Sequence, residues 1–330
     1  MVNYMIYNKI INEGILIMVK ILITGALGQI GSELIEPLIN QYGEKNIIIS
    51  DINKNSKDNG SSQYVDLNVT DIVKFENIVK TNEITHIIHN AAILSATGEN
   101  NPELALKVNN QGFENALSIG KEYGCTILSP SSIAVFGETT PKINTPDDTI
   151  MRPNTMYGIT KLWNELLGEY YFNKWGVDYR ALRYPGIISY KTKPGGGTTD
   201  YAIDIFHKAI LNQTFNCFIS SETVLPMMYM PDCVNATLDF MKVPNEQLKR
   251  RVYNVSSFEI SPSILTTEIK KYYPNFKINY DIDYRQNIAE NWPNSLDDSN
   301  ARNDWNWSPK YNINLMSKDM IEKLKQIYDI

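Results

Sequence analysis

Between Val19 and Tyr184 the chain alternates short β-branched runs with amphipathic stretches, and this alternation constrains the fold more than any other feature. Six strands are predicted, over residues 19–24, 46–50, 63–67, 84–92, 125–130 and 177–185. Four helices are predicted between them, over residues 29–41, 71–80, 102–123 and 156–175. Strand–helix repeats with right-handed crossovers place helices on both faces of one parallel sheet. The sequence therefore predicts an α/β, doubly wound Rossmann fold.

A Gly-x-x-Gly-x-x-Gly motif, formed by Gly25, Gly28 and Gly31, separates the first predicted strand from the first helix. The first glycine allows a tight turn, the second lets a pyrophosphate approach the backbone, and the third lets helix and strand pack closely. Free N–H groups at the helix start, together with the helix dipole, attract the anion. A plain turn is the alternative, but the strand and helix on either side favour a dinucleotide site.

Asp51 ends the second predicted strand, at about the spacing of twenty residues that dinucleotide sites use. A carboxylate there accepts hydrogen bonds from the adenosine ribose and repels a 2′-phosphate, which selects NAD over NADP. A solvated turn aspartate is the alternative, because Asp51-Ile52-Asn53 is turn-like in composition. The other positions assigned to the NAD site are Leu27, Gln29, Ile30, Asp66, Leu67, Asn90, Ala91, Ala92, Asn109, Tyr184, Pro185 and Ile187.

Tyr157 and Lys161 share one face at the start of the predicted helix 156–175. Oxidation of an alcohol by NAD needs a base, and a free tyrosine, with a pKa near ~10, is too weakly ionised at neutral pH. A neighbouring ammonium favours the phenolate, so Tyr157 is predicted to be the base and Lys161 the group that tunes it. Ser131 and Ser132 follow the fifth strand at the ligand edge of the sheet, and either hydroxyl could bind the substrate oxygen.

The second half of the chain supplies the candidates for substrate binding. Gly197, Thr198, Thr199 and Asp200 belong to a glycine-threonine loop that offers backbone N–H groups, two hydroxyls and one carboxylate; a flexible surface loop is the alternative. Ser95, after the fourth strand, is another polar candidate. Arg183 could bind a carboxylate bidentately or could pair with a structural acid, and the sequence leaves both open.

We expect three parts: an N-terminal extension over residues 1–17, an NAD-binding Rossmann domain over 18–185, and a mainly substrate-binding lobe over 186–330 that partly returns to the sheet. The methionines at 227, 228 and 230 are predicted to be core, as are the tryptophans at 305 and 307. Trp292 and Asp297 are weaker candidates for closing over the site.

Composition narrows the class of protein. A formal net charge of -6 without a basic face excludes nucleic acid as the main partner. No apolar run approaches the roughly 20 residues that cross a bilayer. The isolated Cys125, Cys217 and Cys233 suit packing thiols in a reducing compartment, so the cytoplasm is expected. Three histidines leave no Cys/His cluster at zinc spacing, and no catalytic metal is expected.

Five motifs together resemble the extended short-chain dehydrogenase/reductases: TGALGQIG, HNAA, PSSIAVFG, YGITK and RYPG. The resemblance covers nearly all of the chain after Met18 and matches the family's catalytic serine with Ser132. Longer segments resemble the family of short-chain L-threonine 3-dehydrogenases: TMYGITKLWNELLGEYYF, LRYPGIISYKTKPGGGTTDYA, PMMYMPDC and NWPNSLDDSNARNDWNW. This resemblance implies metal-independent oxidation of L-threonine by NAD to 2-amino-3-oxobutyrate, in a homodimer.

Two other functions stay open. Nucleotide-sugar epimerases or dehydratases share the glycine loop, serine, tyrosine and lysine, but they must hold a diphosphate, and the second half shows no clear basic cluster for one. A non-catalytic NAD-sensing protein has no need for Tyr157, Lys161 and Ser132 together.

Overall fold

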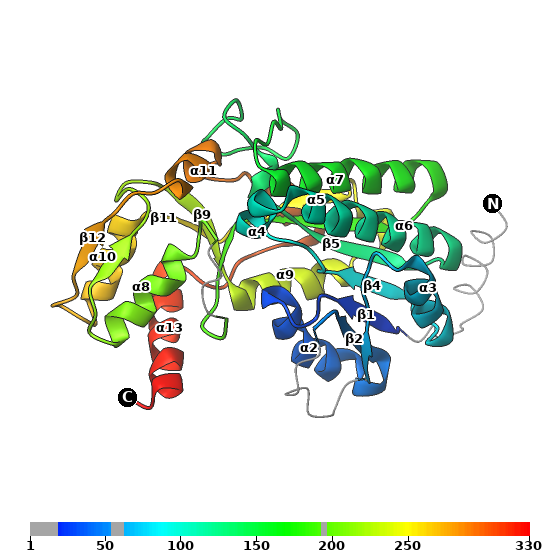
Figure 1. The fold of residues 1–330 in the computed structure, drawn as a ribbon, viewed down its shortest axis with the longest axis horizontal. Coiled ribbons are helices and arrows are strands. Elements are labelled where there is room, and N and C mark those ends of the chain that lie inside the picture. The colour runs from blue at the N-terminus through cyan, green and yellow to red at the C-terminus, as the bar shows by residue number, and fades with distance from the viewer. Residues whose placement is uncertain (1–18, 54–62, 193–196) are drawn as a thin grey trace. The chain divides into compact units, whose positions relative to one another are not determined.

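The structure is a computed structural model that describes residues 19–53, 63–192 and 197–330 (Figure 1). These residues form two compact units. Of the described residues, the first unit comprises those up to Ala92, Asn110–Ser129 and Leu167–Arg180, and the second comprises Ile93–Asn109, Pro130–Leu166 and those from Ala181 onward. Neither unit is one continuous stretch of chain. The N-terminal extension expected over residues 1–17 lies outside the described residues.

A seven-stranded sheet has the order β10-β6-β5-β4-β1-β2-β3. Its strands are β1 (Ile21–Thr24), β2 (Ile47–Asp51), β3 (Gln63–Asp66), β4 (His86–His89), β5 (Thr126–Ser132), β6 (Tyr179–Tyr184) and β10 (Val252–Asn254). The pairs β1–β2, β1–β4, β2–β3, β4–β5 and β6–β10 are all parallel. This confirms the predicted Rossmann-type fold and all six predicted strands. Strand β10 comes from the second half of the chain, as the expected return to the sheet requires.

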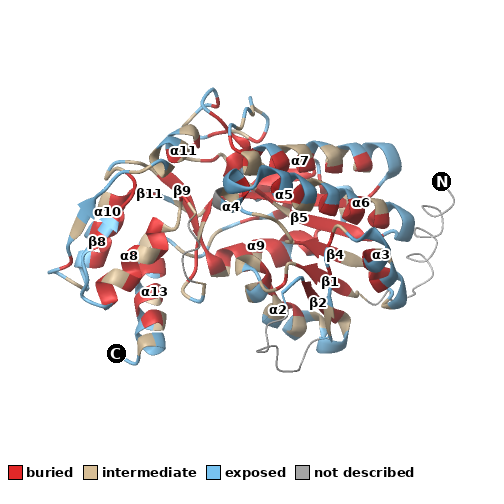
Figure 2. Ribbon diagram, in the orientation of Figure 1, coloured by how far each residue is buried: buried red, intermediate tan, exposed pale blue. Residues whose placement is uncertain are grey.

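Burial explains why the strands read as unbroken apolar runs. Every residue of β1 and β2 is buried, whereas the edge strand β3 is exposed at both ends (Figure 2). Parallel strands covered on both faces need apolar side chains at successive positions rather than at alternate ones. The β-branched runs in the sequence therefore correspond to the interior of the sheet.

The predicted helices are observed with small changes at their ends, as α2 (Gln29–Tyr42), α3 (Ile72–Thr81) and α7 (Met156–Trp175). The single helix predicted over 102–123 is divided into α5 (Pro102–Ala105), a π-helical segment (Leu106–Gln111) and α6 (Gly112–Tyr123). The extra residue of a π turn changes which side chains face inward, and such turns often lie at functional sites. Here the segment contains the buried Asn109. The short helix α4 (Ser95–Asn100) was not predicted.

The second unit contains two smaller sheets. One has the order β11-β9-β7, with β7 at Gly186–Ile188, β9 at Leu225–Tyr229 and β11 at Phe258–Ile260; the other pairs β8 (Phe215–Cys217) with β12 (Ile278–Tyr280). Its later helices are α8 (Tyr201–Ile210), α9 (Met230–Lys242), α10 (Pro262–Lys270), α11 (Arg285–Asn291), α12 (Ser299–Trp305) and α13 (Ile313–Tyr328). Three short 3-10 turns, Glu44–Asn46, Ile133–Val135 and Asn245–Gln247, complete the described elements.

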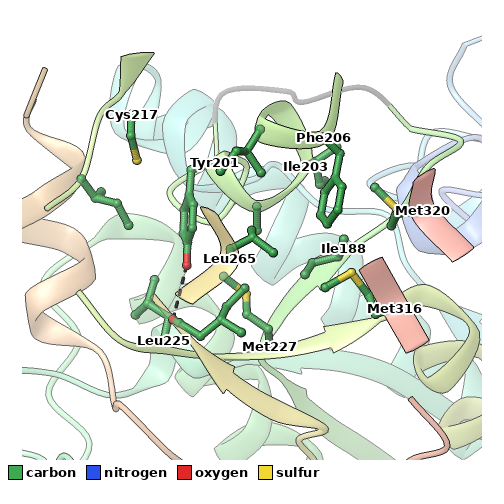
Figure 3. Close-up of a cluster of buried hydrophobic side chains, with 14 of the residues drawn as sticks. Ile188, Tyr201, Ile203, Phe206, Cys217, Leu225, Met227, Leu265, Met316 and Met320 are labelled. Carbon is green, nitrogen blue, oxygen red and sulfur yellow. Dashed lines mark hydrogen bonds between the residues drawn. The ribbon is translucent and has the colours of Figure 1, made fainter. Parts of the chain in front are cut away.

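A hydrophobic cluster in this unit joins β7 and β9 to α8, α10 and α13. Figure 3 shows Ile188, Tyr201, Phe206 and Met227 among its buried side chains. The Tyr201 hydroxyl donates to the Ile260 carbonyl at 3.5 Å. The methionines predicted to be core are buried, and so are the tail tryptophans: Met227, Met228, Met230, Trp305 and Trp307. Trp292, a weaker candidate for closing over the site, is one of the buried residues of the hydrophobic cluster. The three cysteines are buried and none of them forms a disulfide in the described structure, as expected of packing thiols.

Candidate active site

The glycine loop of the first unit has the backbone geometry that its motif predicts. Gly25 has φ +62, and a Cβ there would lie only 2.6 Å from the backbone nitrogen of Ala91. A Cβ on Gly31 would collide with the Gly25 carbonyl oxygen, and it would lie 2.8 Å from the Cα of Ala26. The first position therefore needs a residue that tolerates positive φ, and the third needs one without a side chain.

The start of α2 is suited to an anion. Gly28 is its N-cap; no side chain caps the helix there, and no acidic residue lies in its first turn. The first N–H groups of an α-helix have no partner within the helix, so those of Gln29 and Ile30 are available to a ligand. A Cβ on Gly28 would contact only the Gly25 carbonyl oxygen, at 3.3 Å. This uncapped, glycine-lined helix start fits a dinucleotide pyrophosphate.

Asp51 connects the end of β2 to the glycine loop. Its Oδ2 accepts a hydrogen bond from the Leu27 N–H at 3.0 Å, and its Oδ1 accepts one from the Asn53 N–H at 3.0 Å. The Asn53 bond is the turn contact that the sequence left open as an alternative. A carboxylate has about four acceptor positions, so two remain for the hydroxyls of a ribose. Asp51 can therefore stabilise the turn and still accept hydrogen bonds from a ribose.

The end of β4 carries an unpartnered polar side chain. Both Nδ2 and Oδ1 of Asn90 are buried, with no hydrogen-bond partner among the described residues. A buried amide without partners is costly, which points to a group that is bound when the protein works. The neighbouring Ala91 N–H lies 3.4 Å from the Thr24 hydroxyl. These residues belong to the first unit, as does the glycine loop.

Other predicted cofactor residues have partners within the protein. Asp66 pairs with Lys74 at 2.6 Å on the exposed edge strand, while the buried Leu67 donates its N–H to the Asp51 carbonyl at 3.1 Å. Asn109 bonds the backbone N–H and carbonyl of Ile93, at 2.7 and 3.0 Å, and the Thr160 hydroxyl at 3.0 Å. The side chain of Asn109 thus has a structural task.

At the end of β6, the predicted cofactor residues are held by the second unit. The Tyr184 hydroxyl lies 2.6 Å from that of Thr237, and Ile187 pairs with Met228 in the three-stranded sheet. Pro185 lies between β6 and β7. The contact of these residues with NAD stays a prediction.

Tyr157 and Lys161 lie one helical turn apart at the start of α7, in the second unit. The Lys161 Nζ is 5.6 Å from the centre of the Tyr157 ring and donates to the Pro130 carbonyl at 2.7 Å. Burial raises the pKa of Tyr157 to about 12, although a hydrogen bond with Ser132 lowers it. Burial lowers the pKa of Lys161 to about 8, against the opposing effect of the Glu165 charge. The structure thus places the lysine ammonium next to the tyrosine ring, and the roles of base and tuning cation stay predictions.

The two serines at the end of β5 face different partners. The Ser131 hydroxyl donates to Oε1 of Glu165 in a short hydrogen bond. The Ser132 Oγ accepts from the Ala134 N–H at 3.2 Å, and of the two serines it is the one whose hydrogen bonding lowers the pKa of Tyr157. Of the two, Ser132 is therefore the serine that adjoins the base, which agrees with the register of the family motif.

Arg183 has the structural partner that the sequence left open. Its Nε and Nη2 bind the two carboxylate oxygens of Glu165 at 2.9 and 2.8 Å, and its Nη1 donates to the Asp147 carbonyl at 2.7 Å. Both side chains of the pair are buried. These contacts favour a structural role for Arg183 over binding of substrate. Sequence analysis missed Glu165, although its place four residues after Lys161 on a helix was a usable signal.

Two residues of the glycine-threonine loop are hydrogen-bonded to each other just before α8. The Gly197 N–H donates to Oδ2 of Asp200 at 2.7 Å, Thr198 is buried, and the Thr199 side chain fills the space next to Gly186. The two glycines before Gly197 lie outside the described residues. Asp297, the other candidate for closing the site, accepts from the Ser299 N–H at 2.9 Å, in a turn before α12.

Ser95 begins α4, and this helix is linked to the start of α7. The Glu99 carboxylate of α4 accepts a 2.6 Å hydrogen bond from the Met156 N–H, next to Tyr157. The helix that contains Ser95 is therefore held near the predicted base. Within the described ranges, no group of three or more His, Cys, Asp or Glu side chains is arranged to hold a metal ion. None of the described helices is long and apolar enough to cross a membrane.

Comparison with known proteins places this site in a family. Residues 21–256 match the model of the NAD dependent epimerase/dehydratase family. The mitochondrial L-threonine 3-dehydrogenase of Bos taurus is 45% identical over 89% of this chain and 79% of its own length. An uncharacterized epimerase/dehydratase of Staphylococcus saprophyticus is 44% identical over 93% of this chain and 98% of its own. The crystal structure of L-threonine dehydrogenase from Clostridium difficile is 48% identical, with a TM-score of 0.92, over 94% of this chain and 98% of that one.

Proposed function

This chain belongs to the NAD dependent epimerase/dehydratase family, and from that membership we propose that it is an NAD-dependent L-threonine 3-dehydrogenase. It oxidises the β-hydroxyl of L-threonine to the ketone of 2-amino-3-oxobutyrate. The observation that carries the proposal is the set of Tyr157, Lys161 and Ser132 in one unit, in a chain 45 to 48% identical to proteins named for this activity.

The reaction removes one proton from the hydroxyl oxygen and one hydride from the β-carbon. Bound NAD supplies the acceptor for the hydride. Tyr157, as the phenolate, takes the proton, and Ser132 donates a hydrogen bond to the oxygen that becomes the carbonyl. The ammonium of Lys161 stabilises the phenolate and would hold the ribose of the nicotinamide. The three side chains, Tyr157, Ser132 and Lys161, all belong to the second unit.

The residues of the first unit fit the rest of the cofactor. Gly28, Gln29 and Ile30 would bind the pyrophosphate through backbone N–H groups, and Asp51 the adenosine ribose. Asn90, whose amide is buried without a partner, would bind the cofactor near the end of β4.

Recognition of the amino acid is assigned to the polar residues of the second unit. Thr198 and Thr199 would offer hydroxyls and Asp200 a carboxylate for the ammonium, while Ser95 lies on the helix that contacts the start of α7. Gly197 is left out because its N–H already donates to Asp200. Arg183 is left out of this set because Glu165 already occupies its guanidinium.

We also propose that the protein is a homodimer. The helix α7 exposes apolar side chains at helical spacing: Ile159 is 44% exposed, Leu166 57% and Tyr170 51%. A stripe of this kind on a helix is buried when a second copy packs against it.

We assign the protein to the cytoplasm and to threonine catabolism. Its three buried cysteines, none of which forms a disulfide in the described structure, support a reducing compartment.

The decisive experiment follows NADH absorbance when the purified protein is given NAD and L-threonine. The expected result is NADH formation that depends on L-threonine and is absent with 2-butanol, which lacks the carboxylate and the ammonium. A parallel sample with a UDP-sugar is assayed for epimerisation. Epimerisation of the sugar without oxidation of threonine would overturn the proposal.

A further inference from the structure

Glu165 is a buried acid that the proposed reaction does not use directly. It lies on α7, four residues after Lys161, and its side chain is only 3% exposed. Arg183 binds both of its oxygens, and the Ser131 hydroxyl donates to one of them. A paired carboxylate can be purely structural, so its relation to Lys161 has to be argued from the groups that surround that lysine.

The groups around Lys161 come from β5, from α7 itself and, through Glu165, from β6. From β5, the Pro130 carbonyl accepts its ammonium at 2.7 Å, and Ser131 is the next residue along that strand. From α7, Tyr157 lies one turn before it and Glu165 one turn after it. From β6, Arg183 faces Glu165. Among these groups, Glu165 is the acid whose charge acts on Lys161, and that charge opposes the fall in lysine pKa that burial causes.

The hydrogen bond from Ser131 gives Glu165 a second connection to the same place. Ser131 follows Pro130, whose carbonyl holds the ammonium, so the carboxylate fixes the backbone segment on which Lys161 depends. The chain of contacts thus runs from Arg183 to Glu165, then to Ser131, Pro130 and Lys161. Each contact lies within the second unit.

We infer that Glu165 is a positioning residue of this site, which keeps Lys161 protonated through its charge and fixes the lysine's carbonyl acceptor through Ser131. The inference rests on the proposed function only for what Lys161 does in turnover. The electrostatic part holds for the free protein, without cofactor or substrate. It can therefore be tested apart from activity.

Variants that differ in charge distinguish this electrostatic role of Glu165 from a purely structural one. Glu165→Gln removes the negative charge that opposes the effect of burial, so the pKa of Lys161 should fall. The double change Glu165→Gln with Arg183→Met removes both charges of a neutral pair, and the pKa should then lie between the wild-type value and that of the single variant. Glu165→Asp keeps the charge and should restore the wild-type value more closely than Gln. A loss of packing alone predicts no such order.

The test is an NMR titration of the apo protein labelled with ¹³C at the Cε of lysine. The Lys161 resonance is assigned by its loss in Lys161→Met, and we expect it to titrate below ordinary lysines because burial lowers its pKa to about 8. In Glu165→Gln the midpoint should fall by at least about one pH unit, as expected when an opposite charge is removed nearby. Protonated Lys161 at pH 8 then drops from about a half to about a tenth.

The matched control is Asp304→Asn, which removes another buried carboxylate from the second unit. Asp304 pairs with Lys249 at 2.8 Å and with the Tyr253 hydroxyl at 3.0 Å. It should leave the Lys161 midpoint unchanged. Circular dichroism melts check that each variant is folded, and if Glu165→Gln does not fold, the charge-balanced double variant is compared with Glu165→Asp. An unchanged Lys161 midpoint in every folded Glu165 variant that lacks the charge would overturn the inference, whether or not the protein oxidises threonine.

Discussion

The backbone N–H of Leu27 donates a 3.0 Å hydrogen bond to Oδ2 of Asp51, so the acid at the end of β2 also holds the glycine loop in place. The second oxygen of the same carboxylate accepts from Asn53 at 3.0 Å. One side chain therefore shapes the loop and, in the proposed function, selects the cofactor. A change at this residue has two separable effects.

We predict that the wild type strongly prefers NAD and that Asp51→Ala narrows its preference over NADP, because the repulsion of a 2′-phosphate is lost. Asp51→Ala should also weaken binding of NAD itself, since Leu27 loses its acceptor. Asp51→Asn removes the charge but keeps an acceptor, so it should change preference with a smaller loss of affinity. The ratio of kcat/KM for the two cofactors measures the preference, and Kd values from fluorescence measure the affinity for NAD. Equal use of both cofactors by the wild type would refute the assignment.

Tyr157→Phe should lower kcat by about 10²–10⁴-fold while NAD binding stays within a few-fold, because only the ionisable oxygen is removed. Steady-state rates and a cofactor titration measure the two effects separately. If the variant keeps more than a tenth of the wild-type turnover, another residue is the base.

Ser132→Ala should move the pH dependence in a defined direction. The Ser132 hydrogen bond lowers the pKa of Tyr157, and its loss raises that pKa. Because the active form is the phenolate, the rising limb of kcat/KM should shift to higher pH. A shift of one unit gives about a ten-fold loss at neutral pH that shrinks as the pH increases. A loss of the same size at every pH would mean that Ser132 does not act through Tyr157.

Stereochemistry tests the substrate geometry more sharply than substrate class. The β-carbon of L-threonine must present its hydrogen to the nicotinamide while its hydroxyl meets Tyr157 and Ser132. L-allo-threonine, inverted at that carbon, cannot satisfy both demands with its carboxylate and ammonium bound. Each unpaired polar group costs about 1–3 kcal/mol, so its kcat/KM should be at least about five-fold lower. Comparable rates on the two diastereomers would exclude this pocket geometry.

The exposed stripe of α7 predicts an effect on assembly. Leu166→Glu places a charge in the proposed dimer contact and should shift the protein to a monomer in sedimentation velocity. Ile327→Glu, on α13, is the control, because Ile327 is equally exposed, at 55%, but lies outside the stripe. A wild type that is monomeric at micromolar concentration would contradict the proposal.

Features that depend on neighbours in the chain were predictable from sequence. The parallel strands follow from unbroken apolar runs, the turn at Gly25 from its motif, and the shared face of Tyr157 and Lys161 from helical spacing. Burial of the methionine segment and of the tail tryptophans also followed from residue type. In each case the local pattern and the tertiary structure favour the same conformation, so the pattern is enough.

Tertiary structure decided which partner each polar group has. Residue types alone could not choose between Ser131 and Ser132, which only the family resemblance separated, nor between two roles for Arg183. Sequence analysis also missed both Glu165 and the π-helical segment around Asn109. Those choices depend on residues 18 to 51 positions away, such as Arg183 for Glu165 and Thr160 for Asn109. A buried polar group must be satisfied by whatever the fold brings next to it, and no local periodicity records that neighbour.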